Sequence, residues 1–96
     1  MTITKTVNGS EAVLYFEGWL DTTAAPVMRA EVDALGEDIT GIVLDFEKLE
    51  YISSSGIREV VAAYKKVNGN LKIENASQGI MSIFRDTGLD KKITFE

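Results

Sequence analysis

The sequence contains no cysteine and no histidine among its 96 residues. These absences exclude a disulfide, a cysteine nucleophile, a Ser-His-Asp triad and a metal site with His or thiolate ligands. No glycine-rich loop of the Walker type is present either. A serine hydrolase would lack its base. We therefore expect a protein that is not an enzyme and that holds neither a metal nor another cofactor.

Basic residues are scarce: ten Lys and Arg stand against 15 Asp and Glu, for a net charge of −5. Nucleic acid and anionic membrane surfaces are bound through basic patches, so neither is expected as a partner, whereas a basic protein is allowed. Residues 1–5 lack the apolar core of a signal peptide, and no apolar run approaches the length of a membrane span. The expected location is the cytoplasm, without direct membrane contact.

The composition is that of an ordinary globular protein, with 45% hydrophobic and 26% charged residues. We expect a single domain over 1–96, with one modest core. The residues before Asn8-Gly9 resemble a strand, and this dipeptide is a strong hairpin signal because both residues accept a positive φ. The apolar run Ala12–Phe16 predicts an interior strand that stops at Gly18.

A first helix is predicted after Gly18. Thr23 is its expected cap, Pro26 falls in its first turn, and Gly36 is a plausible stop. Its apolar residues recur with helical spacing at Met28, Val32 and Leu35. The run Ile42–Phe46 then predicts a strand buried on both faces.

A second helix is predicted over about Ser55–Val67, and Asn68-Gly69-Asn70 ends it. Its apolar stripe consists of Ile57, Val60, Val61, Tyr64 and Val67. The alternation in Leu71–Glu74 predicts a strand, which leads to a last helix capped by Ser77 and stopped by Gly88. That helix carries Ile80, Ile83 and Phe84. Ile93–Phe95 suits a short edge strand.

The predicted order is ββαβαβαβ, an α/β fold with a small mixed sheet carrying helices. Strand–helix–strand alternation implies parallel pairing with right-handed crossovers, while the opening hairpin is antiparallel. Binding sites in such sheets collect beyond the carboxyl ends of the strands. The polar residues after Leu20 and around Ser53 should therefore form one surface.

Three serines and a glycine, Ser53-Ser54-Ser55-Gly56, stand where a buried strand gives way to a helix. Free backbone N–H groups and the helix dipole favour negative charge there, so the start of the helix would stabilise the charge of a phosphoserine. The alternative is that the serines only cap the helix, with Ser54 or Ser55 as the cap.

These residues resemble the STAS family, which comprises bacterial anti-sigma-factor antagonists and cytoplasmic domains of sulfate transporters. Ile42–Phe46 with Tyr51–Ile57 is similar to the family's strand followed by Asp-Ser-Ser-Gly-Leu, and Gly18–Pro26 is similar to its Gly-x-Leu-Asp-x-x-x-Ala-Pro loop. Asn75–Ser77 and Ile83–Leu89 resemble the last helix. Members usually carry one more helix after the final strand, which these 96 residues do not include.

The resemblance implies that Ser54 accepts phosphate, and that Ser53 replaces the family's usual Asp. Unmodified, the protein would bind an anti-sigma factor that is also an ATP-dependent serine kinase, which frees the sigma factor and regulates bacterial transcription. Phosphorylation would end binding, and a serine phosphatase would restore it. The alternative is a constitutive STAS scaffold in a transporter or signalling assembly, whose serines are not phosphorylated.

The expected partner-binding surface comprises Asp21, Thr22, Thr23, Ser53, Ser54, Ser55, Gly56, Ile57 and Arg58. Asp21 has helix capping as an equal alternative, and Gly56 is expected to let a partner's backbone approach closely. Asp45 is expected to bond loop N–H groups. Trp19, the only tryptophan, suits either the core or an interface anchor.

Overall fold

The computed structural model describes residues 1–96. The predicted order ββαβαβαβ is confirmed, with one short 3-10 turn added before the last strand. The elements are β1 Thr2–Asn8, β2 Glu11–Leu20, α1 Ala25–Asp33, β3 Gly41–Ile52, α2 Ser54–Lys66, β4 Leu71–Glu74, α3 Gln78–Asp86, η1 Leu89–Lys91 and β5 Thr94–Phe95. The strands lie in the order β1-β2-β3-β4-β5. β1 is antiparallel to β2, and the other neighbours are parallel, as predicted.

The hairpin turn lies one residue later than predicted. Asn8 pairs with Glu11, so the loop residues are Gly9 and Ser10, and only Gly9 takes a positive φ, of 64°. The Ser10 carbonyl accepts a hydrogen bond from the Thr40 N–H at 2.8 Å, which ties the turn to the segment before β3. The dipeptide correctly indicated a hairpin, but strand pairing decided which two residues form the loop.

Strands β2 and β3 extend further than predicted. β2 does not stop at Gly18 but reaches Leu20, and β3 continues past the predicted end at Phe46 to Ile52. The register between the two strands shifts between Tyr15 and Glu17 and again between Gly18 and Trp19. Gly18 has a φ of 108°, which few other residues tolerate. These bulges carry the pairing through residues that look like breaks in the sequence.

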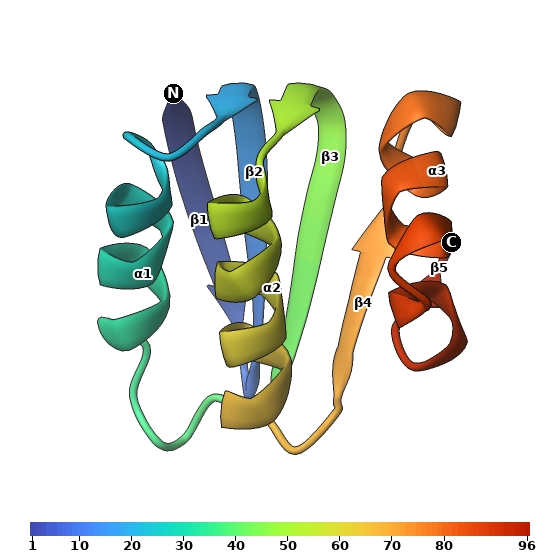
Figure 1. Cartoon of the computed structure of the whole chain (residues 1–96). Helices are drawn as coiled ribbons and strands as arrows, with labels where there is room; N and C mark the ends of the chain where they lie inside the picture. The colour runs from blue at the N-terminus through green and yellow to red at the C-terminus, as the bar shows by residue number, and fades with distance from the viewer.

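All three helices cover one face of the sheet. Figure 1 shows α1 and α2 side by side in front of the strands, with α3 beside β4 and β5. Alternate strand residues point toward this helix layer and join one hydrophobic core. Its largest fully buried side chains are Phe16, Phe46, Phe84, Leu14, Leu20, Met28, Ile42, Leu44, Ile73 and Val60. The predicted apolar face of α1 is confirmed at Met28 and Val32. The helix ends at Asp33, before the predicted stop at Gly36, so Leu35 is buried from the segment that follows it.

Helix α2 begins at Ser54, one residue earlier than predicted. Its predicted apolar stripe is confirmed except at Val61, since Val60 and Val67 are buried and Ile57 and Tyr64 pack partly against the core. Val61 is only half-buried and lies outside the core. The buried line consists of Gly56, Val60, Ala63 and Val67. Each residue turns the helix by 100°, so Val61 cannot share the direction of Val60. Ala63 escaped prediction because its small side chain contributes little to an apolar pattern.

The opposite face of the sheet carries no helix, and we call it the open face. It is formed by the alternate residues of the strands that point away from the core. Val43 lies on this face, flanked by Val13 and Lys72 of the neighbouring strands, and is only 3% exposed. Burial of β3 on both faces is thus confirmed at Val43, whereas Asp45 is half-buried.

The C-terminal third follows the prediction closely. Positive φ values at Asn68 and Gly69 end α2, and Gly88, with a φ of 77°, follows α3. The Ser77 hydroxyl caps α3 by accepting a hydrogen bond from the Ile80 N–H at 3.2 Å. β5 is the predicted short edge strand. None of the helices combines the length and the apolar character that crossing a bilayer requires.

Candidate functional site

Two strand ends bring the predicted site residues together. Leu20, the last residue of β2, pairs in register with Ile52, the last of β3. The Ser53 N–H donates a hydrogen bond to the Leu20 carbonyl at 2.9 Å. The loop after β2 and the start of α2 therefore leave the sheet side by side, at the upper end in Figure 1. We call the surface of 21–23 and 53–58 the serine rim.

The three serines of the rim have different surroundings. Ser53 is the cap of α2: its backbone is extended, and its hydroxyl accepts a hydrogen bond from the Gly56 N–H at 3.2 Å. The prediction that Ser54 or Ser55 caps the helix is wrong, because both already have places inside the helix. Ser54 is exposed, and its hydroxyl makes no hydrogen bond within the protein. Ser55 is half-buried.

Gly56 is buried and serves the fold. A Cβ atom added there would lie 2.8 Å from the Leu20 carbonyl oxygen and 2.9 Å from Cγ1 of Ile52. Such distances do not occur between real atoms without a shift of the backbone, so only glycine lets α2 start this close to β2. The prediction that Gly56 admits a partner's backbone is wrong, because the close approach is to the protein's own strand.

Asp21 caps the turn that leads into α1. Its Oδ1 accepts a hydrogen bond from the Ala24 N–H at 2.9 Å, and its carbonyl accepts from Ala25. Ala24 is the cap position of α1 and offers no side-chain bond, so the prediction of Thr23 as the cap is wrong. Thr22 and Thr23 are exposed. Asp21 therefore has the structural role of holding the turn before α1, although Ala24 is the cap of the helix itself. The side chains of the two threonines make no hydrogen bond within the protein.

A shallow groove of about 260 Å³ joins the two parts of the rim. Its lining consists of Thr22, Ala25, Pro26, Arg29, Ser55, Arg58 and Glu59. Nε of Arg29 lies 3.2 Å from Oε1 of Glu59, which links α1 to α2 beside the groove. Arg58 is exposed and has no ion-pair partner, while Ile57 packs partly against the core. Arg29 and Glu59 were missed because they are thirty residues apart, with no local signal.

Asp45 lies away from the rim because β3 continues past it to Ile52. Its Oδ1 accepts a hydrogen bond from the Glu47 N–H at 3.0 Å, within β3 and not in a loop as predicted, and its Oδ2 accepts from Asn75 Nδ2 at 3.2 Å. Trp19 is 57% exposed, so it is not a core residue. Its ring lies 5.4 Å from that of Tyr51, centroid to centroid, which was not anticipated.

The strand-end surface with its Ser-Ser-Ser-Gly segment agrees with the resemblance to the STAS family. A match over nearly the whole chain supports it independently. The sequence profile described as STAS domain matches residues 2–96. The chain belongs to the STAS domain family. This STAS domain is 29% identical over 85 residues to the anti-sigma-B factor antagonist of Bacillus subtilis (strain 168), an alignment that covers 85% of this chain and 78% of that protein.

Solved structures share the fold of this STAS domain. The anti-sigma factor antagonist SpoIIAA in its unphosphorylated form matches with a TM-score of 0.79 and 20% identity, over 99% of this chain and 87% of that one. SpoIIAA of Bacillus in its phosphorylated form gives 0.78 and 22%, over 99% and 91%. A sulfate transporter family protein from Wolinella succinogenes gives 0.76 and 13%, over 95% and 80%. At these identities the likeness concerns the fold alone.

Proposed function

We propose that this STAS domain is an anti-sigma-factor antagonist, a binding module whose serine rim docks on an anti-sigma factor. The relative from Bacillus subtilis, at 29% identity, supports this assignment. The rim offers exposed polar side chains around a shallow groove, which suits contact with a protein surface better than enclosure of a small substrate. The proposed partner surface keeps Thr22, Thr23, Ser54, Ser55 and Arg58.

Ser54 is the proposed phosphate acceptor, and its free, exposed hydroxyl is the observation that carries the proposal. The hydroxyl of Ser53 is occupied with capping, and Ser55 is half-buried beside the groove. Ser54 is the first residue of α2, where the helix dipole stabilises a negative charge. A kinase therefore reaches Ser54 without breaking a hydrogen bond of the fold.

Phosphorylation is proposed to switch binding while the fold stays intact. A phosphate adds about −1.5 to −2 charges and tightly held water at the centre of the rim. If a partner must bury that group, each loss of about 1.4 kcal/mol weakens binding tenfold. The likeness to both forms of SpoIIAA, with TM-scores of 0.79 and 0.78, supports a fold that tolerates the modification. The proposed partners are an anti-sigma factor with serine kinase activity and a serine phosphatase.

The test starts with the unphosphorylated protein as bait for its anti-sigma factor, followed by incubation of the purified pair with ATP. Intact mass and peptide mapping then locate the phosphate. We expect label on Ser54, loss of the complex as label accumulates, and full binding without label for Ser54→Ala. Ser53→Ala and Ser55→Ala are the matched controls and should still be labelled.

The outcomes separate the proposal from its alternatives. Label on Ser53 or Ser55 with Ser54 untouched would contradict the assigned acceptor. A stable complex that carries no label on any serine would instead favour a constitutive STAS scaffold whose serines are not phosphorylated. No binding to an anti-sigma factor would reject the antagonist function itself.

A further inference from the structure

The open face carries three exposed aromatic side chains. Tyr15 is 42% exposed, Trp19 57% and Tyr51 43%. Trp19 and Tyr51 are register partners, and each is followed by a buried residue, so both point away from the helices. Tyr15 lies four residues before Trp19 on β2 and points the same way. Aromatic side chains that gather on an uncovered face are typical of a docking site.

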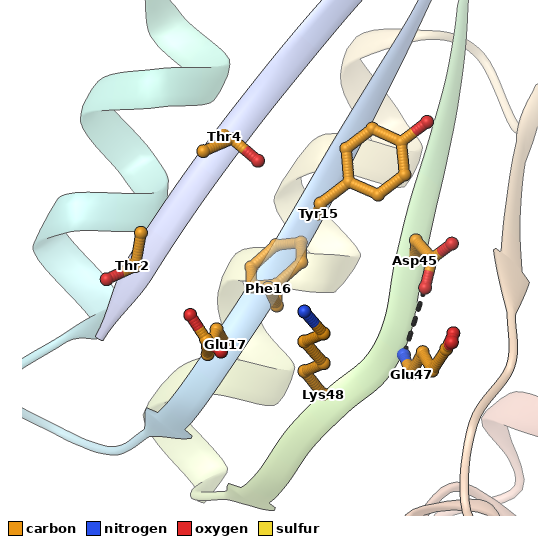
Figure 2. Close-up of a pocket in the computed structure, with 8 residues that line it drawn as sticks. All are labelled: Thr2, Thr4, Tyr15, Phe16, Glu17, Asp45, Glu47 and Lys48. Carbon is orange, nitrogen blue, oxygen red and sulfur yellow. Dashed lines mark hydrogen bonds between the residues drawn. The ribbon is translucent and has the colours of Figure 1, made fainter.

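An acidic hollow lies on the same face, beside the aromatic residues. Its volume is about 320 Å³, and it is lined by Thr2, Thr4, Tyr15, Phe16, Glu17, Asp45, Glu47 and Lys48. Figure 2 shows Tyr15, Asp45 and Glu17 around the hollow, with the Lys48 amine near its centre. Three carboxylates stand against this single amine, and the amine forms no ion pair with any of them. The hollow thus keeps a negative charge that is not neutralised.

The other lysine on this face does not balance that charge. Nζ of Lys72 lies 3.1 Å from a carboxylate oxygen of Glu96 and 3.6 Å from one of Glu74. The hydrogen bond to Glu96, with the negative charges of Glu96 and Glu74, raises the pKa of Lys72. The charge of Lys72 is therefore paired with Glu74 and Glu96 at the β4 side of the sheet, away from the hollow.

We propose that this aromatic–acidic face, formed by Tyr15, Glu17, Trp19, Asp45, Glu47 and Tyr51, docks an arginine-bearing segment of a partner protein. A guanidinium group matches both features at once: it pairs with carboxylates in a fork, and it stacks on aromatic rings. In this proposal one arginine lies beside Tyr15 and the carboxylates and displaces the Lys48 amine, which no ion pair holds, from the centre of the hollow. The segment then crosses the Trp19–Tyr51 pair toward the carboxyl ends of the strands.

The charge of the face decides against other occupants. A second copy would bring the same acidic hollow onto this one, and like charges facing each other oppose association. Nucleic acids and anionic lipids carry the same sign of charge as the hollow. The face lies across the sheet from the helices, whereas Ser54 belongs to α2 on the other side. Docking here therefore does not require the serine rim or its phosphorylation.

The test uses Trp19, the only tryptophan, as a built-in probe. The full chain is titrated with a short capped peptide that has arginine at alternate positions, and with matched peptides that carry lysine or glutamate there. We expect a saturable change in Trp19 fluorescence with the arginine peptide, weaker binding with lysine and none with glutamate. Amide chemical shifts should move along β2 and β3. Shifts confined to α1, α2 and the serine rim would overturn the proposal.

Paired variants separate docking from general attraction between acids and bases. Glu17→Gln should weaken binding more than Glu37→Gln, which removes the same charge from an exposed residue between α1 and β3. Tyr51→Ala should weaken binding roughly two- to fivefold, the loss of one exposed cation–π contact, with unchanged thermal unfolding as the check on folding.

Equal losses in Glu17→Gln and Glu37→Gln would leave only nonspecific attraction and reject the site. Ser54→Ala should bind the arginine peptide as the wild type does. A change in that variant would reject the separation of the two surfaces, whatever the result for the anti-sigma factor.

Discussion

Two neighbouring residues of β2, Tyr15 and Phe16, have opposite surroundings. Phe16 is 2% exposed, and its ring meets Phe46 edge-on with the centroids 5.2 Å apart. Tyr15 is 42% exposed and borders the acidic hollow. The same contrast holds along the sheet, because strand residues alternate between the helix layer and the open face. The helix layer supplies the packing that specifies the fold, so the open face is free to carry side chains for other purposes.

The serine rim repeats this contrast within a single motif. Ser53 and Gly56 are committed to the helix start, through a hydrogen bond and a close contact. Ser54 and Arg58 are exposed and have no partner within the protein. The Ser-Ser-Ser-Gly segment thus places residues that hold the start of the helix beside Ser54, the proposed phosphate acceptor.

The sharpest test of the two faces is a pair of aromatic-to-alanine substitutions. Phe16→Ala should cost about 3–5 kcal/mol of unfolding free energy because it removes a large buried ring and leaves a cavity. Tyr15→Ala should stay within about 0.5 kcal/mol, the range of surface substitutions. Urea denaturation of both variants measures the difference. Equal losses would show that the open face also contributes to the core.

Two substitutions of glycine by alanine should change the stability of the protein in opposite directions. Gly56→Ala should destabilise the protein by about 1–3 kcal/mol, since the added methyl group overlaps β2. Gly79→Ala is the matched control in α3, where the nearest atom to an added Cβ is the Ser77 hydroxyl at 3.9 Å. It should stabilise the helix by about 0.5–1 kcal/mol. The melting temperatures of the two variants should therefore move in opposite directions, and a stable Gly56→Ala protein would contradict the close packing described for the rim.

The sequence predicted most of the fold because its strongest signals are local. Apolar spacing identified the buried face of α1, and Ser77 and Gly88 bounded α3. The family motifs identified the rim before its geometry was known. The adjacency of its two loops followed from parallel pairing alone.

The failures came from contacts between distant segments. Pairing with β2 keeps Glu47–Glu50 in β3, although these residues have no local strand pattern. The role of Gly56 depends on the position of Leu20 in another strand. The cap of α2 is Ser53, one residue before the predicted candidates, because β3 ends at Ile52 and the helix begins at Ser54. Local patterns fix the kind of each element, whereas its last residue and its neighbours are set by the whole sheet.

The capping difference between the serines predicts a smaller effect. Ser53→Ala should cost about 1 kcal/mol because the Gly56 N–H loses its acceptor. Ser54→Ala should change the unfolding free energy by less than about 0.5 kcal/mol, since its hydroxyl bonds to nothing. Denaturation curves of both unphosphorylated variants provide the comparison. A larger loss for Ser54→Ala would mean that its hydroxyl has a structural role, and the case for a free acceptor would fail.

The smallest predicted effect concerns Arg58, and it rests on Ser54 being the site of phosphorylation. Arg58 lies four residues after Ser54 in α2, so the two side chains share one face of the helix. A phosphate on Ser54 would gain an ion pair there, of about 0.2–0.5 kcal/mol. Protein with phosphoserine incorporated at position 54 during synthesis, with and without Arg58→Ala, measures this gain independently of any kinase. Arg58→Ala should destabilise only the phosphorylated form, and molar salt should reduce the difference. Equal effects on both forms would show that Arg58 does not contact the phosphate and is free to meet the partner instead.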